Sequence, residues 1–159
     1  KYNLYWIESP IKENIENIYE LKKIRKKLNN KGIKLAGLEN QIMKNGFFEF
    51  VKNNTHDVMM PDVKYSGGPD EMIELDKFFS KHNIEFSPHN PSGPIAHAHS
   101  IQICSVSTSC LLEYQYKESD KFDSIINLSN TPIINSKVRT ITSEKGLGIS
   151  INMENLLKK

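Results

Sequence analysis

The sequence has few cysteines, no long apolar run and no marked excess of either charge. Its two cysteines, Cys104 and Cys110, are too few for a disulfide framework and lack zinc-ribbon spacing, so we expect buried free thiols in a reducing cytoplasm. No apolar run approaches the roughly 20 residues that span a bilayer, and no signal-peptide pattern opens the chain. A net charge of +2 gives no reason to expect nucleic acid or a membrane surface as a partner.

The chain itself has 159 residues, which suits about one domain of ordinary globular composition. It begins with Lys1 instead of methionine, and residues 2–7 already have the pattern of a strand. We therefore expect a piece of a longer protein. The neighbouring lysines at 22–27 fall within one amphipathic stretch and are expected to form a solvated helix face.

Apolar runs and amphipathic segments alternate along residues 1–117. The expected strands are at 4–7, 33–38, 58–60, 84–86 and 110–112, and the expected helices are at 13–28, around 47–51, at 70–82 and at 95–104. This unit recurs at intervals of about 25 residues, which predicts βαβ crossovers and a parallel sheet of an α/β protein. The pattern alone leaves both a barrel and an open doubly wound sheet possible.

Residues 118–159 are more polar and contain only short β-like runs. These runs are at 132–134, 138–141 and 149–151, and Gly146 and Gly148 predict a turn between the last two. We expect this segment to be a tail that packs on another domain or on the outside of the sheet.

An ionisable residue lies at or just beyond the end of each expected strand. The five residues are Glu8, Glu39, Asp62, His89 and Glu113. Parallel strands joined by right-handed crossovers point these ends the same way, and in a (β/α)8 barrel that end holds the active site. Clustered carboxylates repel unless a cation or a proton lies among them.

Each residue type suits a particular part of such a site. Glu8 and Glu39 are hard oxygen ligands of the kind Mg2+ prefers, and His89 beside a carboxylate suits a general base. Taken singly, each has a simpler interpretation. A glutamate after a strand is commonly a helix cap or a solvated loop charge, Asp62 could cap the following turn, and His89 could be an ordinary loop histidine.

Several motifs, in order along the chain, resemble the mandelate racemase branch of the enolase superfamily. They are Tyr5-Trp6-Ile7-Glu8-Ser9-Pro10, Gly37-Leu38-Glu39-Asn40, Met60-Pro61-Asp62-Val63-Lys64-Tyr65-Ser66-Gly67-Gly68, Ser87-Pro88-His89-Asn90-Pro91 with Gly93-Pro94, Leu112-Glu113-Tyr114-Gln115 and Gly146-Leu147-Gly148. The similarity runs nearly from end to end. At Gly37-Leu38-Glu39 the sequence departs from the Gly-Glu-Asn often seen in that family.

The resemblance implies a modified (β/α)7β barrel with an α+β capping domain. Residues 1–117 would be about strands four to eight of that barrel, and residues 118–159 a tail packing toward the capping domain. The first metal-binding aspartate and a lysine motif on strand two would precede this chain, which would need that N-terminal part to complete the barrel.

The resemblance also implies the roles of the strand-end residues. Glu8 and Glu39 would bind Mg2+, and Asp62 and His89 would form the dyad that moves the proton α to a carboxylate. Glu113 would hydrogen-bond the substrate carboxylate as it becomes an enediolate.

By the same resemblance, the favoured reaction is dehydration of an acid sugar to a 2-keto-3-deoxy acid. The alternative in the same class is a racemase or epimerase of a 2-hydroxy acid, which needs a second base on the opposite face. Members of the family form dimers or octamers, so we expect a homo-oligomer.

Two other interpretations belong to different classes. His97 and His99 form a His-x-His pair near His89, as a zinc hydrolase could use, but the pair falls in an expected helix, where residues two apart diverge. A barrel homologue that serves only for binding or assembly is the non-catalytic alternative.

Overall fold

The structure of the protein is a computed structural model that describes residues 2–91, 93–107, 111–114, 121–126, 133–138, 140 and 145–157. The elements in chain order are β1 (Trp6–Glu8), η1 (Ile15–Asn17), α1 (Ile18–Asn29), β2 (Lys34–Gly37), η2 (Lys44–Phe47), α2 (Phe48–Lys52), β3 (Val58–Met59), α3 (Pro69–Ser80), β4 (Glu85–Phe86), α4 (Gly93–Val106), α5 (Phe122–Ile125), β5 (Ile133–Ile134), β6 (Lys137–Val138) and α6 (Met153–Leu157). The first four strands and the helices that follow them appear where the sequence predicted them, with boundaries shifted by a few residues.

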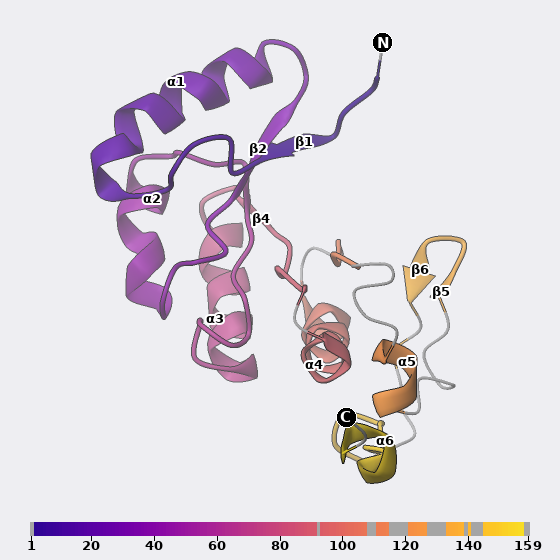
Figure 1. The fold of residues 1–159 in the computed structure, drawn as a ribbon. Coiled ribbons are helices and arrows are strands. Elements are labelled where there is room, and N and C mark those ends of the chain that lie inside the picture. The colour runs from indigo at the N-terminus through magenta and orange to yellow at the C-terminus, as the bar shows by residue number, and fades with distance from the viewer. Residues whose placement is uncertain are drawn as a thin grey trace.

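Strands β1 to β4 form one parallel sheet in the order β1-β2-β3-β4. Strands that are consecutive in the sequence are therefore neighbours in space, as in a barrel wall. A doubly wound sheet would reverse its strand order at some point, and none of these four strands does so. Figure 1 shows α1, α2 and α3 together on one side of these strands. The arrangement fits the barrel alternative.

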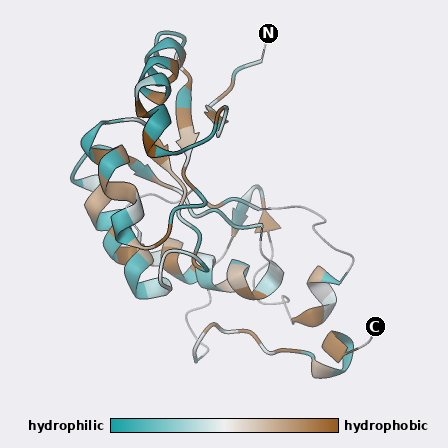
Figure 2. Cartoon of the chain, turned by 60° about the vertical axis from the view of Figure 1, so that its left-hand side comes forward, coloured by the Kyte–Doolittle hydropathy of each residue, from teal (hydrophilic) through white to brown (hydrophobic). Residues whose placement is uncertain are grey.

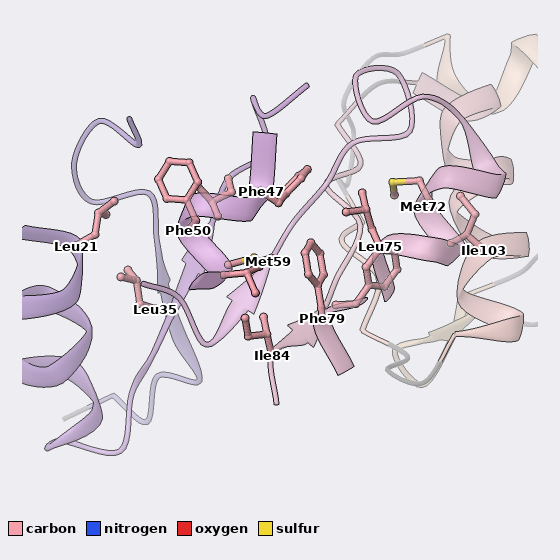
Figure 3. Packing of buried hydrophobic residues seen from close by; sticks show 13 residues of the cluster. Leu21, Leu35, Phe47, Phe50, Met59, Met72, Leu75, Phe79, Ile84 and Ile103 are labelled. Carbon is pink, nitrogen blue, oxygen red and sulfur yellow. The ribbon is translucent and has the colours of Figure 1, made fainter. Parts of the chain in front are cut away.

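The main hydrophobic core lies between the sheet and its helices. Leu35 of β2, Met59 of β3 and Phe86 of β4 point toward the helices and are almost fully buried. The ring centroids of Phe47 and Phe79 are 5.3 Å apart with an edge-on tilt, which joins the η2–α2 segment to α3. Figure 3 shows these side chains packed in one continuous layer. This layer holds the strands in register and so fixes where their ends lie.

A second, smaller cluster covers the opposite face of the sheet. It consists of Ala36, Val58 and Met60, with Trp6 packed against them. Successive strand residues alternate between the two faces, so these side chains occupy what would be the interior of a barrel. Trp6 and Tyr5 line a hollow together with Leu111, which belongs to the segment that follows α4. The inner face of the sheet thus borders that hollow at Trp6.

Local sequence signals explain where the helices begin. The Asn14 side chain accepts a hydrogen bond from the Asn17 backbone and caps η1, and Pro69 occupies the first position of α3. The lysines at 22, 23, 26 and 27 are exposed along α1, as the sequence predicted. Figure 2 shows hydrophilic and hydrophobic residues alternating around these helices. Each helix therefore presents an apolar side to the sheet and a polar side to solvent.

The strand expected at 110–112 is not formed at Leu111 and Leu112, and Cys110 lies outside the described residues. That prediction needs correction. Residues 111–114 are irregular and lie beside β4 through isolated contacts, such as the Ser87 hydroxyl donating to the Leu111 carbonyl at 3.2 Å. Isolated bonds of this kind hold a segment in place without the repeated ladder that defines a strand.

Among its described residues, the tail contains one hairpin and two short helices, α5 and α6, which its apolar runs did not predict. β5 and β6 form a two-stranded antiparallel hairpin, and a turn does occur at 145–148. The run expected at 138–141 is a strand only at Val138 within the described residues, and 149–151 contributes a single bridge, from Ile151 to Ile126. The division of the chain at residue 117 stays a prediction.

Cys104 is half-buried on α4 and not in a disulfide, and it is less enclosed than expected; Cys110 lies outside the described residues. Within the part of the chain that the structure describes, no helix combines the length and apolar character needed to cross a bilayer.

Candidate active site

The predicted site residues lie at one edge of the sheet. Glu8 is the last residue of β1, and Glu39 follows β2 after one intervening residue. Asp62 and His89 each lie three residues beyond their strands, and a parallel bridge pairs them across β3 and β4. Glu113 lies next to them on the segment beyond α4. The parallel topology brings these ends together because every strand runs the same way.

A direct contact between two predicted site residues joins Asp62 and His89. Asp62 Oδ2 lies 3.0 Å from His89 Nδ1, and Asp62 is 1% exposed. The other carboxylate oxygen, Oδ1, accepts the backbone N–H of Lys64 at 2.8 Å. Asp62 therefore does cap its turn, as the simpler interpretation proposed, and holds the imidazole with its second oxygen at the same time.

The two groups influence each other's protonation. Burial alone would raise the pKa of Asp62, but hydrogen bonds from His89 and the Lys64 backbone outweigh it and hold the pKa below its usual value. Burial alone would lower the pKa of His89, but the hydrogen bond to Asp62 and the nearby Glu113 outweigh it and leave the pKa raised. Asp62 is thus an anion near neutral pH, and His89 is a stronger base than a free imidazole.

Glu113 is fixed to the histidine segment through Asn90. Glu113 Oε2 accepts the Asn90 backbone N–H at 2.9 Å, and the Asn90 side-chain amide donates to the Glu113 carbonyl, also at 2.9 Å. The same amide lies 2.6 Å from His97 Nδ1. Burial lowers the pKa of His97, so the ring is neutral and Nδ1 can accept that hydrogen bond. Asn90 therefore sets the position of Glu113 relative to His89.

Glu8 and Glu39 form the carboxylate side of the site. Partial burial raises the pKa of Glu8, and the neighbouring Glu113 and Glu39 carboxylates raise it further. The Ser9 hydroxyl donates to Glu39 Oε2 at 3.0 Å and orients that side chain. This repulsion between like charges is what a bound cation would relieve, and oxygen donors are the ligands that Mg2+ prefers.

The donor set for a cation is incomplete among the residues that the structure describes. Among the described residues, no group of three or more histidine, cysteine, aspartate or glutamate side chains is placed to hold a metal ion. Glu8 and Glu39 therefore fit Mg2+ as a pair that needs a further ligand. The prediction that these two residues bind the metal stays a prediction.

The zinc interpretation of His97 and His99 finds no support in the geometry. Both lie within α4, where His97 is 2% exposed and packs against the rings of Tyr114 and Phe122, at centroid distances of 5.3 and 6.0 Å. Residues two apart on a helix point in different directions, so the two imidazoles do not share a face. His97 is a core residue that supports Asn90.

Sequence reasoning missed several residues that support the site. Ser9 and Asn90 each directly follow a predicted site residue within a quoted motif, and that placement is a signal that could have singled them out. The buried pair of Glu13 and His56 gave no signal at all, because the two residues are 43 apart and neither belongs to a recognisable motif. Lys64, whose Nζ lies 3.5 Å from Asp62 Oδ2, falls inside a motif but was assigned no role.

Comparison with known proteins matches residues 1–155 to the family model described as "Enolase C-terminal domain-like". Among curated proteins, a D-galactonate dehydratase from Xanthomonas campestris pv. campestris is 30% identical over 108 residues, which cover 64% of this chain and 28% of the relative. The chain thus spans less than a third of the length of that relative.

Solved structures show the same fold. A mandelate racemase/muconate lactonizing enzyme-like protein from Rubrobacter xylanophilus superposes with a TM-score of 0.79 at 26% identity, over 94% of this chain and 37% of that protein. The 3,6-anhydro-D-galactonate cycloisomerase from Zobellia galactanivorans superposes with a TM-score of 0.83 at 22% identity, over 96% of this chain and 41% of that protein. The chain is therefore similar to a part of a barrel domain in each of them.

Proposed function

Because this chain belongs to the enolase C-terminal domain-like family, we propose that it carries the proton-transfer half of an active site that removes the proton α to a carboxylate. The reaction we propose is dehydration of an acid sugar to a 2-keto-3-deoxy acid. The proposal rests above all on one observation, the 3.0 Å contact between Asp62 Oδ2 and His89 Nδ1.

His89 is the proposed base. A carboxylate beside Nδ1 keeps the proton on that nitrogen and leaves the lone pair of Nε2 free to accept another. Within the described ranges Nε2 makes no hydrogen bond, so it is available to a substrate. In a dehydratase the proton taken by His89 can then be returned to the departing β-hydroxyl, which leaves as water.

Glu8 and Glu39 are the proposed ligands of a Mg2+ ion. Bound there, Mg2+ would supply positive charge near the substrate carboxylate as negative charge develops on its oxygens. Such stabilisation is needed because the α-proton of a carboxylate is too weakly acidic for an imidazole to remove unaided. Glu113 would contribute a hydrogen bond to the same carboxylate, with Asn90 holding it in place.

We further propose that another part of the same protein completes the barrel and supplies the remaining metal ligand. Among the described residues, β1 pairs only with β2, so its other edge is free to add a strand. The inner face beside it opens into the hollow lined by Tyr5, Trp6 and Leu111. The chain also spans 28% of its curated relative. An exposed parallel edge is costly to leave unpaired.

The choice of an acid sugar rests on the sequence around the base. Pro88-His89-Asn90-Pro91 resembles sugar-acid dehydratases, and curated relatives from Xanthomonas bear the name D-galactonate dehydratase. A racemase or epimerase would use the same dyad together with a base on the opposite face of the substrate.

The test is proton NMR of the complete protein with Mg2+ and a panel of acid sugars in D2O. Loss of substrate with appearance of a 2-keto-3-deoxy product, abolished by His89→Asn, is the expected result. Deuterium entering the α-position without elimination would instead establish a racemase or epimerase. If no carboxylate in the panel reacts or exchanges, the acid-sugar proposal fails.

A further inference from the structure

A buried pair of a glutamate and a histidine, Glu13 and His56, lies near the edge that carries Glu39 and is not used in the proposed proton transfer. Glu13 Oε1 lies 2.9 Å from His56 Nε2, and the two side chains are 8% and 0% exposed. Glu13 precedes α1 and His56 precedes β3, so the pair joins two loops that are distant in sequence. Buried charges are costly, so a pair enclosed this fully calls for a structural reason.

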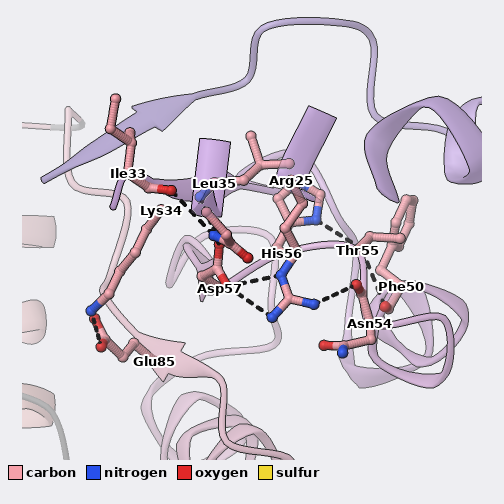
Figure 4. Close-up of polar contacts among 11 residues, drawn as sticks. Arg25, Ile33, Lys34, Leu35, Phe50, Asn54, Thr55, His56, Asp57 and Glu85 are labelled. Atoms are coloured by element: carbon pink, nitrogen blue, oxygen red, sulfur yellow. Dashed lines mark hydrogen bonds and ion pairs between the residues drawn. The ribbon is translucent and has the colours of Figure 1, made fainter. Parts of the chain in front are cut away.

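The hydrogen bonds around His56 are complete. The Thr55 hydroxyl lies 3.2 Å from the Phe50 carbonyl oxygen and 2.8 Å from His56 Nδ1, so it can hydrogen-bond both groups. Figure 4 shows this chain from Phe50 through Thr55 to the imidazole. With Nε2 donating to Oε1, His56 holds the Glu13 carboxylate in one orientation.

The second oxygen of Glu13 acts on the loop that carries Glu39. Glu13 Oε2 accepts the backbone N–H of Leu38 at 2.7 Å. Leu38 has a φ of +76°, a left-handed conformation that a side chain makes unfavourable and that a glycine would adopt without strain. Its side chain is fully buried in the core, so the loop is held from two sides. The next residue is Glu39.

Gly37 shows how closely Glu13 approaches this loop. A Cβ added at Gly37 would lie 1.9 Å from Glu13 Oε1 and 2.9 Å from the Ser9 hydroxyl. Ser9 is the residue that hydrogen-bonds Glu39 Oε2. Only glycine leaves room for the Glu13 carboxylate and the Ser9 hydroxyl to lie against the end of β2.

From these contacts we infer that Glu13, held by His56, is a positioning residue that keeps Leu38 in its left-handed conformation and thereby aims Glu39 at the cation. The inference rests on the proposed function in one respect, namely that Glu39 binds Mg2+. Its structural part, the restraint on Leu38, stands independently of the metal.

The chain offers a matched control at the opposite end of β2. Asp57 Oδ2 accepts the backbone N–H of Leu35 at 2.9 Å, and Asp57 Oδ1 pairs with Arg25 at 2.8 Å (Figure 4). Like Glu13, Asp57 is a carboxylate that accepts a backbone N–H in or next to β2 and is paired with a basic side chain. It lies away from the edge that carries Glu39, so Asp57→Ala should disturb the strand without disturbing that edge.

The experiment compares Glu13→Ala, Glu13→Gln and Asp57→Ala in the complete protein. We would measure the Mg2+ dissociation constant by calorimetry and hydrogen exchange of the peptide containing Leu38 by mass spectrometry. Glu13→Ala should weaken Mg2+ binding by about tenfold or more, as loss of a residue that orients a metal ligand does. It should also speed exchange at Leu38 by roughly tenfold, because a hydrogen bond to a charged acceptor is lost.

Glu13→Gln should retain Mg2+ binding, because the glutamine oxygen can still accept the Leu38 N–H while its amide donates to Nε2 of the neutral His56 tautomer that carries its proton on Nδ1. Asp57→Ala should leave Mg2+ affinity and Leu38 exchange unchanged even if it lowers stability as much as Glu13→Ala. Equal losses of affinity in Glu13→Ala and Asp57→Ala, or unchanged Leu38 exchange in Glu13→Ala, would overturn the inference. If the unaltered protein binds no Mg2+, the proposed function fails, and Leu38 exchange alone then decides the restraint.

Discussion

Replacing Asp62 with asparagine should disable the base while preserving its surroundings. Asparagine has the same shape, and its oxygen can still accept the Lys64 N–H that Asp62 Oδ1 accepts at 2.8 Å. Its amide nitrogen, however, would face His89 Nδ1 at the position where Oδ2 now lies 3.0 Å away. An amide donates there, so Nδ1 must give up its proton and Nε2 must carry it. Nε2 then cannot accept a proton from the substrate.

The expected loss of rate follows from the role of the Nε2 lone pair of His89, which accepts the substrate proton. General acid–base catalysis contributes roughly 10²- to 10⁴-fold in rate, so kcat for Asp62→Asn should fall by about that factor, or about 3 to 5 kcal/mol of activation free energy. Steady-state kinetics with the substrate found by NMR would measure it. KM should change little, because no contact to the substrate is removed.

The pH dependence gives the same prediction a second readout. His89 must be neutral to act as a base, so the rate should rise with pH through its raised pKa. Asp62→Asn removes the anion that helps raise that pKa. The rise of the rate with pH should therefore occur at lower pH, and the maximal rate should be lower. Asp57→Asn, the same substitution at the other end of the sheet, is the control. A rate within a few-fold of the unaltered protein, with an unshifted pH profile, would refute the assignment of the dyad.

The same pair should contribute to stability in a defined pH window. The pKa of Asp62 is lowered in the folded protein, so its contribution is present above the unfolded value of about 3.9 and is lost as pH falls through the folded pKa. The pKa of His89 is raised, so its contribution is full below about 6.5 and is lost as pH rises through the folded pKa. Urea unfolding should show the largest difference between the protein and Asp62→Asn at about pH 4 to 6.5.

Three further outcomes are expected from single substitutions. Leu38→Gly should be more stable than Leu38→Ala by about 1 kcal/mol, because the φ of +76° suits glycine, whereas the control Ala36→Gly within β2 should destabilise the protein by about 0.5–1 kcal/mol. Urea unfolding would measure both differences, and a Leu38→Ala variant more stable than Leu38→Gly would contradict the strain argument. Glu113→Gln should keep its hydrogen bond from the Asn90 backbone but lose rate by roughly 10- to 100-fold through kcat, and an unchanged kcat would remove Glu113 from the reaction. Glu8→Gln and Glu39→Gln should each weaken Mg2+ binding, measured by calorimetry, by about tenfold or more, and affinity retained in either variant would exclude that residue as a ligand.

Much of the fold could be predicted from the sequence, because the strand and the helix of each unit have their own local sequence patterns. Buried parallel strands are short apolar runs, and the helices between them show a period of 3.6 residues, so β1 to β4 and their helices were predictable one by one. The strand expected at 110–112 failed for the complementary reason. An apolar run becomes a strand only when a neighbour supplies a ladder of hydrogen bonds, and among the described residues Leu111 shows an isolated bond to Ser87, just beyond β4.

The sequence by itself determined which residues follow the strands, and the rule that parallel strands share one direction placed Glu8, Glu39, Asp62 and His89 at a common edge. Glu113 joins them through its hydrogen bonds with Asn90 instead of through a strand. Which of them touch depended on tertiary structure. The 3.0 Å contact of Asp62 with His89 requires β3 and β4 to lie side by side in one register, and residues 27 apart carry no local signal of that. The support of Glu39 by the buried Glu13–His56 pair depends on the close approach of two loops around Gly37. Only packing decides such an approach, because its free energy lies in contacts between residues that are far apart along the chain.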